Sequence, residues 1–169
     1  IEKTYLALVN NVPEEFKGII DYKLLKKENP HPNLLPIRER EAKAKPERVR
    51  VQEAMVVDED GKYAKTEYHV LDALARKFAL MELKPLTGRT HQLRVHMAAI
   101  GCPIVGDHKY GGSTTDAKSL GVENRLHLHA RRIVIPAFIL GKKIDVSAPL
   151  PAHMRQSFEA LGIDVPKGG

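Results

Sequence analysis

Apolar and polar residues alternate along much of the chain with the two-residue period that is typical of β-strands. The pattern predicts strands over residues 4–9, 48–57, 66–71, 78–83, 125–135 and 144–147. In the first strand, Tyr5, Ala7 and Val9 share one side. Leu6 and Leu8 share the other side, so this strand is predicted to be buried on both faces.

Two segments have the three- to four-residue apolar spacing of a helix instead. The first runs from about 89 to 100, where Leu93, Met97 and Ile100 fall on one face. The second covers 151–161 and has a proline at its start and a glycine directly after it, which are common helix boundaries. Strands outnumber helices, which predicts an α+β fold with a mixed, mostly antiparallel sheet and a few flanking helices.

A polar segment interrupts this pattern after the first strand. Residues 23–45 hold three prolines and the charged run 38–41. We expect a mobile loop there, because such a segment buries too little apolar surface to become ordered. Residues 58–61, Asp-Glu-Asp-Gly, predict a tight turn between two strands.

The composition fits one folded domain. The chain has 169 residues, of which 43% are hydrophobic and 28% charged. Because no apolar run approaches the ~20 residues of a membrane-spanning helix, we exclude a protein of that class. A single cysteine, Cys102, excludes an internal disulfide and favours a reducing compartment, so we expect a cytoplasmic protein.

The net charge of +6 points to an anionic partner. Most of the excess lies between residues 84 and 132, where basic side chains outnumber acidic ones by 8 to 3. A solvated charged face is the alternative interpretation of such a stretch. The same region contains most of the residues with a potential chemical role.

Residues 83–96 combine the end of a strand, a tight turn and the start of a helix. Free backbone amides at a helix start, with Arg89 and Thr90 beside them, would form an anion site suited to a phosphate. Arg94 lies away from the apolar face, and its guanidinium can pair with a carboxylate or phosphate through two hydrogen bonds. A capped helix with solvent-exposed arginines remains the alternative.

The ten residues 87–96, Thr-Gly-Arg-Thr-His-Gln-Leu-Arg-Val-His, resemble the signature of the RluA/RluC/RluD-type pseudouridine synthases. Further matches to that family lie at 3–9, 61–68, 101–107, 110–111 and 125–130. The resemblance implies an isomerase that converts uridine to pseudouridine in structured RNA, which requires the base to leave its stack. It implies no cofactor and no metal, and it favours ribosomal large-subunit RNA over transfer RNA as the substrate. We expect a monomer without a membrane partner.

The resemblance also implies roles for individual residues. Tyr5 corresponds to the tyrosine that stacks on the target base and is positioned to remove a proton at carbon 5. Arg94 corresponds to the arginine that pairs with the nucleophilic aspartate, and Leu128 to an apolar residue that packs on the flipped base. For the grip on RNA we select six residues, namely Arg89, Thr90, His91, Lys109, Arg125 and Arg131.

The family's nucleophile lies in an Arg-Leu-Asp segment, which this sequence lacks. Because the sequence starts at Ile1 within a strand pattern, we expect residues 1–169 to be a partial catalytic domain from a larger protein, inactive in isolation. Arg94 should then face water or a bound anion. A non-catalytic RNA-binding module derived from the same fold is the alternative.

Three other kinds of site are considered and set aside. Eight histidines suggest a metal, but no carboxylate or cysteine completes a ligand set. Cys102 has no base beside it and is interpreted as a buried, inert thiol. Asp107 lies in a glycine-rich turn and is interpreted as a turn-capping carboxylate, not as the nucleophile.

Overall fold

The computed structural model describes residues 1–29 and 52–164. In these ranges seven strands form a single antiparallel sheet in the order β3-β2-β4-β5-β1-β6-β7, which confirms the predicted α+β fold. The strands are β1 Glu2–Asn10, β2 Lys17–Asn29, β3 Gln52–Val57, β4 Lys62–Leu74, β5 Phe78–Pro85, β6 Leu128–Ile135 and β7 Ile144–Ser147. The helices are α1 Gln92–Ala99, α2 Thr115–Lys118, α3 Ala137–Leu140 and α4 Ala152–Leu161. Within these ranges, no helix has the length and apolar character needed to cross a bilayer.

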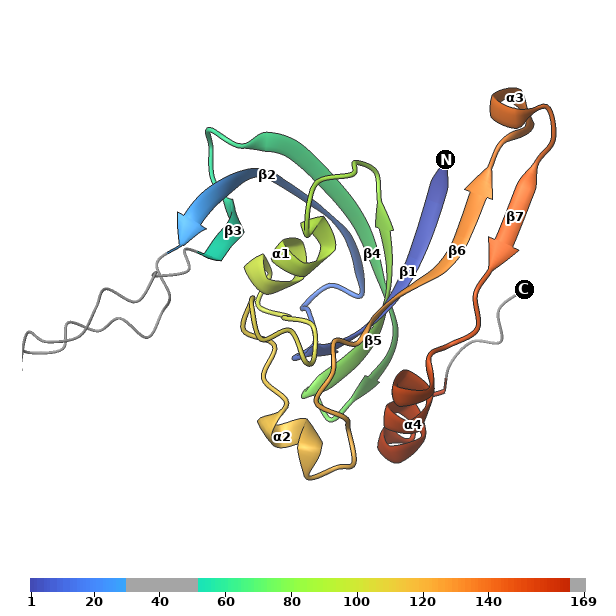
Figure 1. The fold of residues 1–169 in the computed structure, drawn as a ribbon. Helices are drawn as coiled ribbons and strands as arrows, with labels where there is room; N and C mark the ends of the chain where they lie inside the picture. Colours follow the sequence, from blue (N-terminus) through green and yellow to red (C-terminus); the bar gives the residue numbers. More distant parts are fainter. Residues whose placement is uncertain (30–51, 165–169) are drawn as a thin grey trace, which may run out of the picture.

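Helices pack on both faces of the sheet. Figure 1 shows β2 and β4 curving around α1, with α4 on the other side of β1. Ala7 and Val9 of β1 join Met97 of α1 in one apolar cluster, which we call the α1-side core. Leu6 and Leu8 join α4 in a second cluster, the α4-side core. The predicted burial of β1 on both faces is therefore confirmed.

The helix boundaries follow from the local backbone. The predicted 89–100 helix starts only at Gln92, because His91 has a left-handed φ of 52° that a helix cannot continue through. The final helix begins after Pro151 and ends at Gly162, where φ is 64°, as the sequence predicts. The inward face of α4 is also as predicted, since Met154, Phe158 and Leu161 are buried.

The prediction of a loop over 23–45 is wrong for its first part. Residues 23–29 belong to β2, which pairs with β4 on one side and β3 on the other. Leu24 is 1% exposed in that strand, so long-range burial overrides the polar local composition. Residues 30–45, like the first four of the predicted 48–57 strand, lie outside the described residues.

A buried histidine makes the stability of the fold depend on pH. The fully buried His127 donates from Nδ1 to the Arg125 carbonyl at 2.6 Å. Its Nε2 accepts from the Ser157 hydroxyl of α4 at 2.8 Å. Burial, together with the neighbouring His153 ring, lowers the pKa of His127. As the pH falls, the unfolded chain therefore takes up a proton at this residue before the folded chain does.

We predict that the free energy of unfolding falls as the pH drops below about 6.5, the usual histidine pKa. Burial also lowers the pKa values of His91 and His96, so the His127→Gln variant should show a weaker slope but not a flat one. Urea titrations between about pH 7.5 and about pH 5.5 measure this slope. A matched His69→Gln change, at an exposed ring, should leave the wild-type slope. Constant stability across this interval would contradict the account.

Candidate active site

The buried side chain of Gln92 links the loop before α1 to β4 through hydrogen bonds. Its Oε1 accepts from the Thr87 hydroxyl at 2.7 Å and from the Arg89 amide at 3.0 Å. Its Nε2 donates to the Lys65 carbonyl at 2.9 Å and to the Thr66 hydroxyl at 3.0 Å. The Arg89 amide is thus already occupied, so the predicted anion site at this helix start lacks one of its free donors.

Arg94 forms a two-bond ion pair with Asp107. Nε lies 2.7 Å from Oδ2 and Nη2 lies 2.7 Å from Oδ1. The guanidinium also stacks over the Tyr110 ring, 4.9 Å from its centroid. Hydrogen bonding to Asp107 raises the pKa of Arg94, so this side chain stays cationic. The expectation that Arg94 faces only water or a bound anion is therefore wrong, because a carboxylate of the same chain occupies one edge.

The burial and contacts of Asp107 argue against a role as the nucleophile. Its side chain is 0% exposed, and Oδ1 also accepts from the backbone amides of Lys109 at 3.2 Å and Tyr110 at 3.3 Å. The predicted turn-capping role is confirmed by these two contacts. The pairing with Arg94 is an additional role that the sequence did not reveal.

Tyr5 and Leu128 lie on the same face of the sheet as α1. Tyr5 pairs with Leu83 of β5 and with Ala130 of β6, and Leu128 lies opposite Ala7. Both side chains are partly buried and pack against the α1-side core. Within the described ranges the Tyr5 hydroxyl makes no hydrogen bond, which leaves it available to a ligand. The structure therefore brings Tyr5, Leu128 and the helix that carries Arg94 to one face.

Tyr110 organises the polar side of this face. Its hydroxyl shares a 2.8 Å hydrogen bond with His91 Nδ1 and accepts from the Met55 amide at 3.2 Å. The Lys109 ammonium lies 5.9 Å from the Tyr110 ring centroid. Burial, followed by the positive charges of Arg94 and Lys109, lowers the pKa of His91. Sequence reasoning assigned no role to Tyr110, although it belongs to the matched pair Tyr110-Gly111.

The other residues selected for RNA contact are more dispersed. Arg89 and Thr90 are exposed just before α1, and Arg89 Nε donates to the Tyr63 carbonyl at 3.1 Å. Arg125 is exposed before β6, which starts at Leu128 and not at 125 as predicted.

Arg131 lies on the face of the sheet opposite Leu128, as the two-residue alternation along the strand predicts. Thr4 pairs with Arg132 and Tyr5 with Ala130, which leaves Arg131 as the extra residue. β6 therefore contains a bulge here, and Arg132, which alternation places on the Leu128 side, lines the same cavity as Arg131. The Arg131 guanidinium donates to the Ala148 carbonyl.

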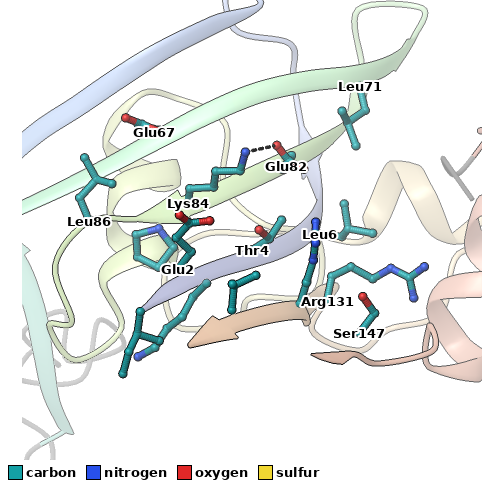
Figure 2. Close-up of a pocket in the computed structure, with 15 residues that line it drawn as sticks. Glu2, Thr4, Leu6, Glu67, Leu71, Glu82, Lys84, Leu86, Arg131 and Ser147 are labelled. Carbon is teal, nitrogen blue, oxygen red and sulfur yellow. Dashed lines mark ion pairs between the residues drawn. The ribbon is translucent and has the colours of Figure 1, made fainter. Parts of the chain in front are cut away.

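That cavity has a volume of about 650 Å³ and is shown in Figure 2. Its floor includes Leu6 of the α4-side core, so it opens on the face opposite Tyr5. Its charges are mixed, and Lys84 pairs with Glu82 at 3.1 Å inside it. We place the candidate active site on the α1 side instead, because that face carries Tyr5, Leu128 and Arg94 together.

Comparison with protein families identifies the family to which the chain belongs. The family model described as RNA pseudouridylate synthase matches residues 1–99, which is more than half of the chain. The chain belongs to the RNA pseudouridylate synthase family. The matched range contains β1 with Tyr5 and the whole of α1 with Arg94. The family resemblance of the sequence is thereby confirmed.

Individual relatives agree with the family match. The chain is 32% identical to ribosomal large subunit pseudouridine synthase C of Rickettsia bellii, over 92% of this chain and 44% of that protein. It is 36% identical to the mitochondrial pseudouridylate synthase RPUSD4 of Danio rerio, over 98% of this chain and 51% of that protein. The structure of human RNA pseudouridylate synthase domain containing 4 superposes with a TM-score of 0.69 at 27% identity, over 98% of this chain and 64% of that one. The chain thus spans about half the length of these curated relatives.

Proposed function

We propose that this chain forms the uridine-isomerising part of an RNA pseudouridine synthase. The observation that carries the proposal is that Tyr5, Leu128 and helix α1, which carries Arg94, lie on one side of the sheet in a member of this family. The nucleophilic aspartate would come from a segment outside this sequence. The difference in length from the relatives leaves room for such a segment.

In the proposed reaction the target uridine leaves its stack and enters the α1-side face. The bond between N1 of uracil and the ribose carbon breaks, and a bond from carbon 5 to the same ribose carbon forms. Carbon 5 then loses its proton and N1 gains one, so the product is an isomer of the substrate. Arg94 would keep the attacking carboxylate ionised and oriented. The Tyr5 ring would stack on the base, and its hydroxyl would serve the proton transfer at carbon 5.

Polar and basic groups beside this face would hold the RNA backbone. Arg89, Thr90, His91 and Lys109 all lie around the start of α1 and the turn that carries Asp107. Arg125 would extend this RNA-binding surface toward β6. We favour ribosomal large-subunit RNA as the substrate, because the Rickettsia relative is named for it. We also propose a cytoplasmic location, based on the single buried cysteine, whose thiol pKa is raised by burial.

Tritium release from RNA that carries uridine labelled at carbon 5 tests this proposal. The intact protein should release tritium from ribosomal RNA in proportion to the pseudouridine formed. The isolated chain should release none and should still bind RNA with an affinity that falls as salt rises. Release by the isolated chain would contradict the assignment of the nucleophile to another segment.

A non-catalytic RNA-binding module is the second candidate. It is favoured by the pairing of Arg94 with Asp107, which occupies one edge of the guanidinium within this chain. The same assay separates the two functions. An intact protein that binds ribosomal RNA but releases no tritium would be such a module.

A further inference from the structure

The Arg94 guanidinium is fixed on two of its sides before any ligand arrives. The Nε–Nη2 edge is taken by Asp107, and one face lies over Tyr110. Nη1 makes no hydrogen bond in the part of the chain that the structure describes. The side chain is still 19% exposed. Since a guanidinium has five N–H donors, a second carboxylate can bind at the Nη1 edge without displacing the first.

The burial of Asp107 separates this ion pair from an ordinary surface pair. Arg132 and Asp145 form the same two-bond geometry, at 2.7 and 2.6 Å, on the β6–β7 hairpin. Their side chains are 44% and 32% exposed, whereas that of Asp107 is 0% exposed. Burying an ion pair carries a desolvation cost that often offsets its attraction. A fully buried carboxylate that holds an arginine by two bonds therefore suggests a role in geometry more than in stability.

We propose that Asp107 is a positioning residue for the isomerisation. It holds Arg94 so that the Nη1 edge receives the nucleophilic carboxylate, and this inference rests on the proposed function. Arg94 then bridges two aspartates, one buried and permanent, the other reactive. Without Asp107 the arginine side chain would regain its rotamer freedom, and the nucleophile would lose its fixed partner.

The alternative is that Asp107 serves only the turn that it caps. Asp107→Asn separates these roles, because the amide oxygen can still accept from the Lys109 and Tyr110 amides. The same change removes the charge and places an NH₂ group where Oδ2 accepts from Arg94 Nε. Arg94→Lys supplies the second half of the test, since an ammonium cannot form the two-bond pair.

A double-mutant cycle in the intact protein tests the proposal, with single-turnover tritium release and RNA affinity as readouts. We expect Asp107→Asn to lower kcat about 100-fold, the loss typical of a misplaced catalytic group, with RNA Kd unchanged within about twofold. In the Arg94→Lys background the same change should lower kcat by no more than about twofold, because the partner of Asp107 is already lost. Asp145→Asn, which breaks the matched surface pair, should leave both readouts at the wild-type value.

Rates are expressed per folded molecule, with the folded fraction taken from urea titration. If Asp107→Asn does not fold, the Asp107→Glu variant is used in its place. Glutamate keeps the negative charge but shifts the carboxylate away from its position opposite Arg94. The same loss of kcat is expected. An equal loss in both backgrounds, or no loss at all, would overturn the role of Asp107 alone. A wild-type protein that releases no tritium would overturn the proposed function, and this role with it.

Discussion

Uridine turnover per folded molecule of the intact protein is expected to disappear when Arg94 is replaced by alanine, while the folded variant still binds RNA. Loss of the guanidinium removes the cation that would orient and ionise the nucleophile, so we expect kcat to fall by at least about 1,000-fold. Tritium release in a single turnover, normalised to folded protein, measures the effect. Arg155→Ala is the control, because it removes an exposed arginine on α4.

Tyr5→Phe should have a similar effect by a different route. The substitution keeps the ring that packs against the α1-side core and removes only a hydroxyl that has no partner in the described residues. Stability should therefore stay at the wild-type value, while kcat falls about 100- to 10,000-fold through loss of the proton-transfer group. Tyr22→Phe, at a tyrosine that is 41% exposed, serves as the control. Full activity of either Arg94→Ala or Tyr5→Phe would refute the assigned roles.

Gly106→Ala is expected to unfold the chain or come close to it. Gly106 has a φ of +77°, and an added Cβ would lie 1.8 Å from the Arg125 carbonyl oxygen. Because these are backbone atoms, they cannot rotate away from the added Cβ as a side chain could. The contact lies between the turn before Asp107 and the segment that leads into β6. We expect a loss of more than about 4 kcal/mol, a large part of the 5–15 kcal/mol that stabilises a typical domain.

The control for this change is Gly111→Ala. Gly111 also has a positive φ, +86°, but an added Cβ would meet nothing within 4 Å. The free energy of unfolding of Gly111→Ala should therefore fall only by the backbone strain of about 1–2 kcal/mol. Urea denaturation of the two variants measures both values. Equal free energies of unfolding for the two variants would contradict this prediction. They would show that the backbone at Gly106 and Arg125 can shift to accept the added Cβ with little loss of stability.

The elements that could be predicted from the sequence are those with complete local signals. β7 and α4 are examples, because period, proline and glycine all mark their boundaries. β1 was predictable as a doubly buried strand because both of its faces are apolar. β2 was not, since its second half is polar and its order depends on pairing with distant strands.

The residues proposed for the site come from the family resemblance, whereas the pairing of Arg94 with Asp107 comes only from the structure. Tyr5, Leu128 and Arg94 follow from the family resemblance, and the fold brings them to one side of the sheet. The Arg94–Asp107 pair joins residues 13 positions apart through the turn after α1, and no local pattern marks such a contact. The bulge in β6 likewise depends on the register with β1, so alternation alone placed Arg132 on the Leu128 side, whereas it lines the same cavity as Arg131.

Photo-crosslinking tests the placement of the site most directly. The intact protein would be irradiated with an RNA that it modifies, in which the target uridine is replaced by 4-thiouridine, and the attached peptides identified by mass spectrometry. We expect cross-links to β1 around Tyr5 and to α1 around Arg94. Cross-links confined to Glu67, Glu82 or Arg131 would place the target uridine in the cavity on the opposite face. That result would contradict an active site on the α1 side of the sheet.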